Sequence, residues 1–434
     1  MKTLLKGGRV YYNSELSNVD LLIEDGKVFD VRSSIPDYEA EAVIHCDNCF
    51  IIPGLIDVHV HFREPGFEYK ETIATGSAAA AAGGYTTVCT MPNLNPAPWN
   101  MENLEKQLVA IEAGGKVRVL PYGRITGPAA ELGAQGEGNT GNIVANLEEM
   151  APYVFAFSDD GAGVQEDVLM EEAMTRAKAL GKVIVAHSED TNYPPEDSRS
   201  EWKQVERDIE LVRKTGCSYH VCHVSTKESV DLIRRAKAEG LDVTCETAPH
   251  YLLFTKAFHG DRLFVSPENA SEHSGLPGGN FKMNPPLRDE EDKQALLEGI
   301  KDGTIDMIAT DHAPHSAEEK SKGFEGSLNG IIGLETAFPV MYSALVLGMY
   351  NGGEGIITFE KLIELMSGAP ARRFGIEGGR LEPGAVADLA IVNFDEEFVI
   401  DPATFRSKGR STPFEGMKVR GSVYGVMVGG IPIE

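Results

Sequence analysis

Two histidines separated by a single residue, His59 and His61, form the pattern in the sequence that most directly suggests chemistry. They directly follow an apolar run at residues 51–56. On a β-strand, residues i and i+2 point to the same face, so the two imidazoles are expected to project side by side and to hold one divalent metal ion. A single His-x-His pair also fits hydrogen-bonded core histidines. The metal interpretation therefore depends on further ligands downstream.

Residues that commonly bind metals follow apolar runs at four further places in the chain. The active sites of parallel barrels lie at the carboxyl ends of the strands, where such residues would converge on one point. A set of His and Asp ligands without thiolate favours zinc, with manganese or cobalt as alternatives, and it is large enough for two ions joined by a bridging group. The residues in question are Asp159, Asp160, His187, His223 and Asp311.

Such a metal site supplies a nucleophile at neutral pH and polarises a carbonyl, which is hydrolytic chemistry. One carboxylate must carry a proton to the leaving nitrogen, and Asp311, the last of the set, is the expected carrier. Arg63 lies one step beyond the histidines and suits a substrate carboxylate, although a salt bridge with Glu64 or Glu68 is the alternative. Asn93, at the end of the second apolar run, could hydrogen-bond the same carboxylate.

The elements that must position these residues alternate between short apolar runs and helix-like stretches. This pattern predicts a parallel sheet of the (β/α)8 barrel type over residues 53–377. A doubly wound open sheet is the alternative, but that fold usually carries a Gly-rich turn where this chain has His-x-His. The eight predicted strands lie within 51–62, 86–92, 116–122, 153–160, 182–187, 218–225, 242–250 and 305–311.

The two ends of the chain have a different character. Short strand-like runs with Gly turns fill residues 1–52 and 378–434, which indicates one small β domain, of the β-sandwich type, assembled from both termini. A Gly-rich stretch at 271–280 is predicted to be a surface loop. His45, His259 and His273 are predicted to lie on the surface.

Composition narrows the possible functions. The 434 residues carry 66 acidic and 40 basic side chains, a net charge of −26 that disfavours nucleic acid and anionic membranes as partners. The six cysteines are scattered, so neither a disulfide framework nor a structural zinc site at Cys46 and Cys49 is expected. No signal peptide or transmembrane run is visible, and a cytoplasmic location is expected.

Four motifs carry a resemblance to a known family. They are Asp-Val-His-Val-His-Phe-Arg-Glu-Pro-Gly at 57–66, Thr-Met-Pro-Asn at 90–93, Lys-Met-Asn-Pro-Pro at 282–286 and Ala-Thr-Asp-His-Ala-Pro-His at 309–315. In this order they resemble the bacterial class I dihydroorotase family of the amidohydrolase superfamily, over nearly the whole chain. The resemblance implies a zinc-dependent barrel that interconverts L-dihydroorotate and N-carbamoyl-L-aspartate in pyrimidine (UMP) biosynthesis.

The resemblance also implies roles for individual residues. In this class an aspartate, rather than a carboxylated lysine, bridges two metals, and residues 146–177 contain no lysine. Asp160 would be the bridge, with Asp159 as the alternative. The implied metal ligands are His59, His61, Asp160, His187, His223 and Asp311, and the implied substrate contacts are His61, Arg63, Asn93, Asn284, His315, Asn329 and Gly330.

One segment departs from the family pattern, because the stretch between His187 and His223 is shorter than expected. The missing part falls near residues 191–200, so lid behaviour and any subunit contact there are open. A homodimer and an association with aspartate transcarbamoylase are possible partnerships. The alternative functions are another cyclic amidohydrolase, such as a hydantoinase or allantoinase, and an inactive scaffold of aspartate transcarbamoylase.

Overall fold

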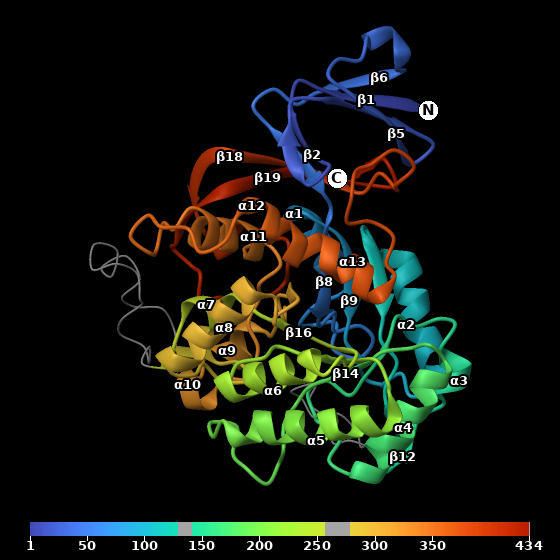
Figure 1. The fold of residues 1–434 in the computed structure, drawn as a ribbon, viewed down its shortest axis with the longest axis vertical. Helices are drawn as coiled ribbons and strands as arrows, with labels where there is room; N and C mark the ends of the chain where they lie inside the picture. The colour runs from blue at the N-terminus through green and yellow to red at the C-terminus, as the bar shows by residue number, and fades with distance from the viewer. Residues whose placement is uncertain (129–140, 257–277, 434) are drawn as a thin grey trace.

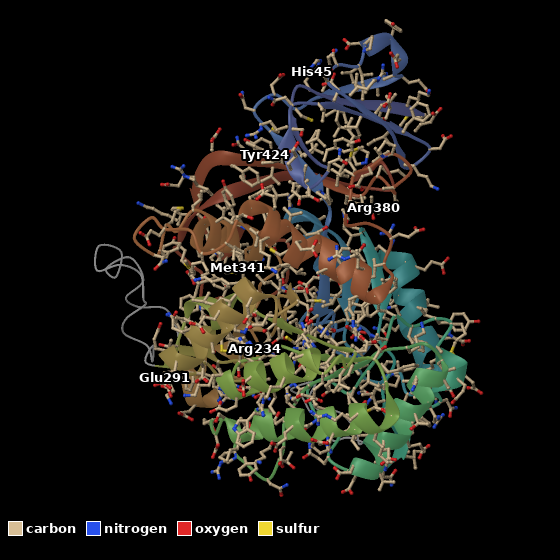
Figure 2. The ribbon with its side chains drawn as sticks, viewed as in Figure 1. His45, Arg234, Glu291, Met341, Arg380 and Tyr424 are labelled. Atoms are coloured by element: carbon tan, nitrogen blue, oxygen red, sulfur yellow. The ribbon has the colours of Figure 1, made fainter. Side chains whose placement is uncertain are left out.

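The computed structural model describes residues 1–128, 141–256 and 278–433. Figure 1 shows a barrel surrounded by helices, with a β-rich part at one end that contains both the first and the last strands of the chain. Most of the stretch at 271–280, together with His259 and His273, lies outside the described residues. His45 is exposed in the β-rich part, as predicted, far from Arg234 and Glu291 among the barrel helices (Figure 2).

The eight predicted strands form the barrel. Strands β8, β9 and β10 make one parallel sheet, and β13 to β17 make a second. Parallel bridges from Gly123 to Phe157 and from Val60 to His312 join the two sheets at both seams, so the barrel is closed. The strands are β8 (Leu55–Val60), β9 (Tyr85–Thr90), β10 (Arg118–Pro121), β13 (Phe157–Ser158), β14 (Ile184–Ala186), β15 (Tyr219–Val221), β16 (Val243–Thr247) and β17 (Met307–Ile308).

Helices connect and cover these strands, and their ends follow local sequence signals. The Thr226 hydroxyl accepts the Ser229 N–H at the start of α6, and α5 ends at Gly216, whose φ of 67° is the left-handed conformation that glycine adopts without a steric penalty. The longer helices are α1 (Ile73–Ala82), α2 (Met101–Gly114), α4 (Asp167–Ala179), α5 (Arg199–Thr215), α6 (Lys227–Ala238) and α8 (Glu290–Asp302). The shorter ones are α3 (Leu147–Met150), α7 (Pro249–Leu253), α9 (Ala317–Lys320), α10 (Gly323–Gly326), α11 (Ala337–Met341), α12 (Phe359–Ile363) and α13 (Ala369–Phe374). Among the described residues, no helix is both long and apolar enough to cross a bilayer.

The first predicted strand, 51–62, is in fact two strands that belong to different sheets. β7 (Phe50–Pro53) pairs with β18 (Leu389–Val399) and β2 (Arg9–Tyr12), whereas β8 begins the barrel two residues later. Gly54 separates them, and a Cβ there would lie 2.1 Å from Thr86 Oγ1, so only glycine lets the chain pass. This break carries the chain directly from the β-rich part into the barrel.

The β-rich part is built from both termini, as the sequence indicated. One sheet has the order β20-β19-β18-β7-β2-β3 and the other β5-β4-β1-β6. Leu5, Leu21 and Val28 share an apolar core with Leu389 and Met427, so the two ends of the chain stabilise each other. The domain boundaries at 53 and 377 stay a prediction. The remaining strands are β1 (Lys2–Lys6), β3 (Glu15–Ser17), β4 (Asp20–Glu24), β5 (Lys27–Arg32), β6 (Ala42–His45), β11 (Thr126–Gly127), β12 (Ile143–Val144), β19 (Lys418–Val428) and β20 (Ile431–Ile433).

Candidate metal centre and substrate cavity

Asp160 lies among four histidines at the carboxyl end of the barrel. Its Oδ1 is 3.4 Å from His59 Nε2, 3.4 Å from His223 Nε2 and 3.5 Å from His187 Nδ1. Its Oδ2 is 3.4 Å from His61 Nε2. The histidines come from β8 and from the loops after β8, β14 and β15, so one carboxylate joins the ends of three strands.

The neighbouring Asp159 turns away from this cluster. Its carboxylate accepts hydrogen bonds from the Arg124 guanidinium, from the Ile125 N–H at 2.9 Å, and from the N–H and hydroxyl of Thr126. These donors account for both oxygens of Asp159. Of the two candidate bridging aspartates, Asp160 is therefore the one that faces the histidines.

Asp311 completes the cluster from the end of β17. Its Oδ1 is 3.1 Å from His61 Nε2 and 3.6 Å from His59 Nε2. Its φ is +49°, a left-handed conformation that costs a non-glycine residue free energy unless its surroundings impose it. The preceding residue, Thr310, is held by the buried Asp57 carboxyl group, which accepts the N–H groups of both His59 and Thr310. Asp57 thus fastens the first barrel strand to the last.

The donor set fits a divalent cation. Among the described residues, three groups of three side chains each offer ligand atoms within 4.8 Å of one another. Two of them belong to this cluster, one of His59, His61 and Asp311 and the other of His59, Asp160 and His223, and the third is His59 with Cys222 and Glu246. His59 Nε2 and Asp160 Oδ1 are buried without a hydrogen-bond partner although they face each other. Buried polar atoms are normally satisfied, and a metal ion between these two would satisfy both.

The carboxylates of the cluster also stabilise positive charge on their neighbours. Burial opposes the shift, but the charge of His59 holds the pKa of Asp160 well below its usual range. Against burial, the nearby carboxylate of Asp160 and that of Glu189, which accepts a hydrogen bond from His187, raise the pKa of His187 to about 10. The carboxylates thus stabilise positive charge, which protonated imidazoles supply here and which a cation held by neutral imidazoles would supply in their place.

Hydrogen bonds behind the cluster set which nitrogen each imidazole turns inward. Nδ1 of His59 lies 2.6 Å from Glu246 Oε1, so this nitrogen carries the proton and Nε2 faces Asp160. Nδ1 of His61 lies 2.9 Å from Asn93 Oδ1, which likewise leaves Nε2 facing inward. Such outer partners fix the tautomer and orientation of metal-binding histidines.

A cavity opens beside the cluster and contains most of the predicted substrate contacts. Its lining places Arg63 and Asn93 on the same cavity as Asn284 and Asp311. Lys320 supports one wall, because its buried Nζ donates to the carbonyls of Leu328 and Gly330. The full lining is His61, Arg63, Asn93, Asp160, Gly161, His187, His223, Asn284, Asp311, Ala313, Asn329 and Gly330.

His315 is the one predicted substrate contact that does not line this cavity. Its Nε2 donates to the Asn329 carbonyl at 2.6 Å, and its Nδ1 accepts from Lys70 Nζ at 3.2 Å. Burial lowers the pKa of His315 to about 3, and the charges of Arg63 and Lys70 act in the same direction, against the nearby carboxylate of Glu319. The ring is therefore neutral, and it supports the cavity wall through Asn329.

Sequence reasoning missed several supporting residues. Glu246 stands in the middle of a strand, and its charge in an apolar run was a usable signal for an inward-facing position. Glu189 follows His187 by two residues, the same spacing that drew attention to Arg63 after His61. Lys70 gave no signal, because a lysine before a helix is usually exposed.

The comparisons with known proteins agree with this geometry. The model of the Amidohydrolase family matches residues 50–432. The sequence is 45% identical over 449 aligned residues to the dihydroorotases of Bacillus cytotoxicus and Bacillus anthracis, covering 99% of this chain and 97% of each relative.

Solved structures with the same fold include hydantoinases. L-hydantoinase (dihydropyrimidinase) from Arthrobacter aurescens has a TM-score of 0.82 at 27% identity, covering 99% of this chain and 95% of that one. Dihydropyrimidinase from Brevibacillus agri has a TM-score of 0.79 at 22% identity, covering 100% and 95%, which shows the shared fold alone.

The fold, the His and Asp cluster and the matching family model together define the class: the chain belongs to the amidohydrolase family, whose members are metal-dependent. It is a cyclic amidohydrolase that acts on a small molecule. Within that family it belongs to the dihydroorotases.

Proposed function

We propose that the chain catalyses the reversible hydrolysis of L-dihydroorotate to N-carbamoyl-L-aspartate in de novo pyrimidine (UMP) biosynthesis. The observation that carries this proposal is the cavity that joins the Asp160 cluster to Arg63. Both compounds are carboxylates, and a guanidinium with the Asn93 amide offers N–H donors to such an anion. In a chain of net charge −26, this local cation makes anion binding favourable.

The proposed cofactor is zinc, with two ions per subunit. His59 and His61 would hold one ion, His187 and His223 the other, and Asp160 would bridge them with Asp311 completing the set. The metals would supply Lewis acidity toward the ring carbonyl. The chain itself would do the rest: Arg63 and Asn93 would fix the carboxylate, and Asn284 with the Asn329–Gly330 backbone would contact the ring amide.

The proposed proton carrier is Asp311. Its carboxylate lines the cavity and lies 3.1 Å from His61 Nε2. From there it can accept a proton from the attacking water and donate it to the ring nitrogen that leaves. Burial opposes the shift, but the hydrogen bond with His61 lowers the pKa of Asp311. A carboxylate that stays ionised before the reaction is ready to accept the proton.

Hydantoin hydrolysis is the second candidate, because the solved structures of similar fold include hydantoinases. The family expectation for those enzymes is a carboxylated lysine as the metal bridge, and Asp160 stands at that place here. The discriminating assay compares kcat/KM for dihydroorotate and hydantoin with the zinc-loaded protein. A higher value for hydantoin would overturn the proposal, and no activity on either would favour an inactive scaffold.

The remaining proposals concern the cell. The enzyme would work in the cytoplasm, as a possible homodimer, and in possible association with aspartate transcarbamoylase. Sedimentation of the purified chain alone and mixed with that enzyme tests both partnerships.

A further inference from the structure

Glu189 connects the metal cluster to the substrate cavity through one oxygen atom. Its Oε2 lies 2.7 Å from His187 Nε2 and 2.9 Å from Asn284 Nδ2. The side chain is 19% exposed, so both contacts are largely screened from water. No role for Glu189 follows from the metal ligands or the substrate contacts described above.

The geometry at this oxygen sets the orientation of both partners. Asn284 Nδ2 donates to Glu189 Oε2, so the amide directs its NH₂ group at the carboxylate, which accepts. His187 Nε2 is the ring nitrogen next to the same oxygen, which leaves Nδ1 on the side of the cluster, 3.5 Å from Asp160 Oδ1 and 2.9 Å from His223 Nε2.

The orientation of Asn284 has a consequence for the cavity. With Nδ2 directed at Glu189, the remaining polar atom of the amide is Oδ1. Asn284 lines the cavity, so it presents an acceptor there. A substrate N–H is the complementary group.

Asn93 has the opposite orientation in the same cavity. Its Oδ1 is occupied by His61, so its NH₂ group is the part left to meet a ligand. The cavity thus has a donor side at Arg63 and Asn93 and an acceptor side at Asn284. A ligand with a carboxylate at one edge and a ring N–H at another matches both sides.

We propose that Glu189 is a positioning residue that makes Asn284 present its carbonyl oxygen to a ring N–H and, with the same oxygen, holds His187 in its metal-binding tautomer. This inference rests on the proposed function for the identity of the ring. Rings that carry N–H at the Asn284 edge are bound in preference to rings that carry N-methyl or ester oxygen there. The Glu189 carboxylate therefore affects both the choice of substrate, through Asn284, and the binding of metal, through His187.

The test is a double-mutant cycle of Glu189→Gln and Asn284→Ala with the zinc-loaded protein. The glutamine keeps the size of the side chain but adds an NH₂ group, which attracts Asn284 Oδ1 and turns the amide round. The KM for dihydroorotate is expected to rise by about 3–10-fold, the value of one hydrogen bond, in the Asn284 background. In the Asn284→Ala background the same substitution should change KM by less than about 2-fold.

A second readout does not involve turnover. Zinc retention is measured by dialysis of each variant against a chelator, followed by metal analysis. Glu189→Gln is expected to weaken zinc binding by about 10-fold in both backgrounds, because His187 loses its charged partner. Glu196→Gln, an exposed acid in the same loop, is the matched control and should change neither readout.

The outcomes separate the two proposals. An equal rise of KM in both backgrounds would overturn the action of Glu189 through Asn284, and unchanged zinc retention would overturn its action through His187. A wild-type protein that does not turn over dihydroorotate would instead contradict the proposed function, and the zinc readout would still test Glu189.

Discussion

Replacing Glu246 by Gln should weaken metal binding without unfolding the protein. Glu246 is buried, with an exposure of 1%, and its two oxygens lie 2.6 Å from His59 Nδ1 and 3.1 Å from His220 Nε2. Burial opposes the shift, but the charge of His59 lowers the pKa of Glu246 to about 2, so the carboxylate is ionised. The substitution removes this charge while it keeps one acceptor oxygen.

The magnitude follows from the lost interaction. A hydrogen bond to a charged group contributes about 1.5–3 kcal/mol, which corresponds to about 10–150-fold in an equilibrium constant. Loss of an outer partner of a metal-binding histidine typically costs about 10–100-fold in metal affinity, so the two estimates agree. We therefore expect the zinc dissociation constant of Glu246→Gln to rise by about 10–100-fold.

The assay is competition for zinc against a chromophoric chelator at neutral pH. Circular dichroism of the metal-free variant checks that it is folded, and Glu298→Gln, an exposed acid on α8, serves as the control. A folded variant whose zinc affinity stays within about 2-fold of the wild type would refute the conclusion that Glu246 orients His59.

Three further predictions concern catalysis and stability. Asp311→Asn should lower kcat by at least about 100-fold, the usual contribution of a general acid–base group, while metal analysis still finds most of the zinc; near-normal kcat would contradict the role of proton carrier. Arg63→Ala should raise the KM for dihydroorotate by about 10–100-fold through loss of charge-assisted hydrogen bonds, with a smaller effect on kcat, and unchanged saturation would exclude a carboxylate contact. Burial raises the pKa of Glu335 to about 7, against the N–H groups of Arg406 and Ser407. The folded state then holds this proton more tightly than the unfolded state, so the residue's contribution to stability falls as the pH rises from about 4.5 to 7. Urea unfolding should show Glu335→Gln gaining stability over the wild type, by up to about 3 kcal/mol, at pH 8 but not at pH 4; an equal difference at both pH values would contradict this pKa.

The barrel was predictable because its signals are local. Each apolar run of the middle region became a parallel strand, and the helix-like stretches at 166–180, 227–238 and 289–302 became α4, α6 and α8 with ends that differ by at most one residue. The break at Gly54 was not predicted, because nothing within the run 51–62 shows that Thr86 approaches the backbone there. That constraint comes from a residue on another strand.

The ligands of the candidate site were predictable for the same reason, whereas their supports were not. His59, His187 and Asp311 stand at strand ends, where the fold itself brings them together. The choice between Asp159 and Asp160 depends on donors from residues 124–126, which are distant in the sequence. The hydrogen bond from Lys70 to His315 likewise joins residues that are 245 positions apart in the sequence, so no local pattern predicts it.

The carboxylate of Asp57, which joins His59 to Thr310, has a consequence for the order of events during synthesis. The candidate ligands His59 and Asp311 lie on the two sides of the contact between the first and the last barrel strands. A growing chain therefore cannot bring these two ligands together until the last strand has been made and has paired with the first. Contacts between residues so far apart form late, because a long loop must close first. Uptake of a tightly bound cation should therefore report that the barrel is closed, and a chain truncated before residue 305 should remain unable to hold it.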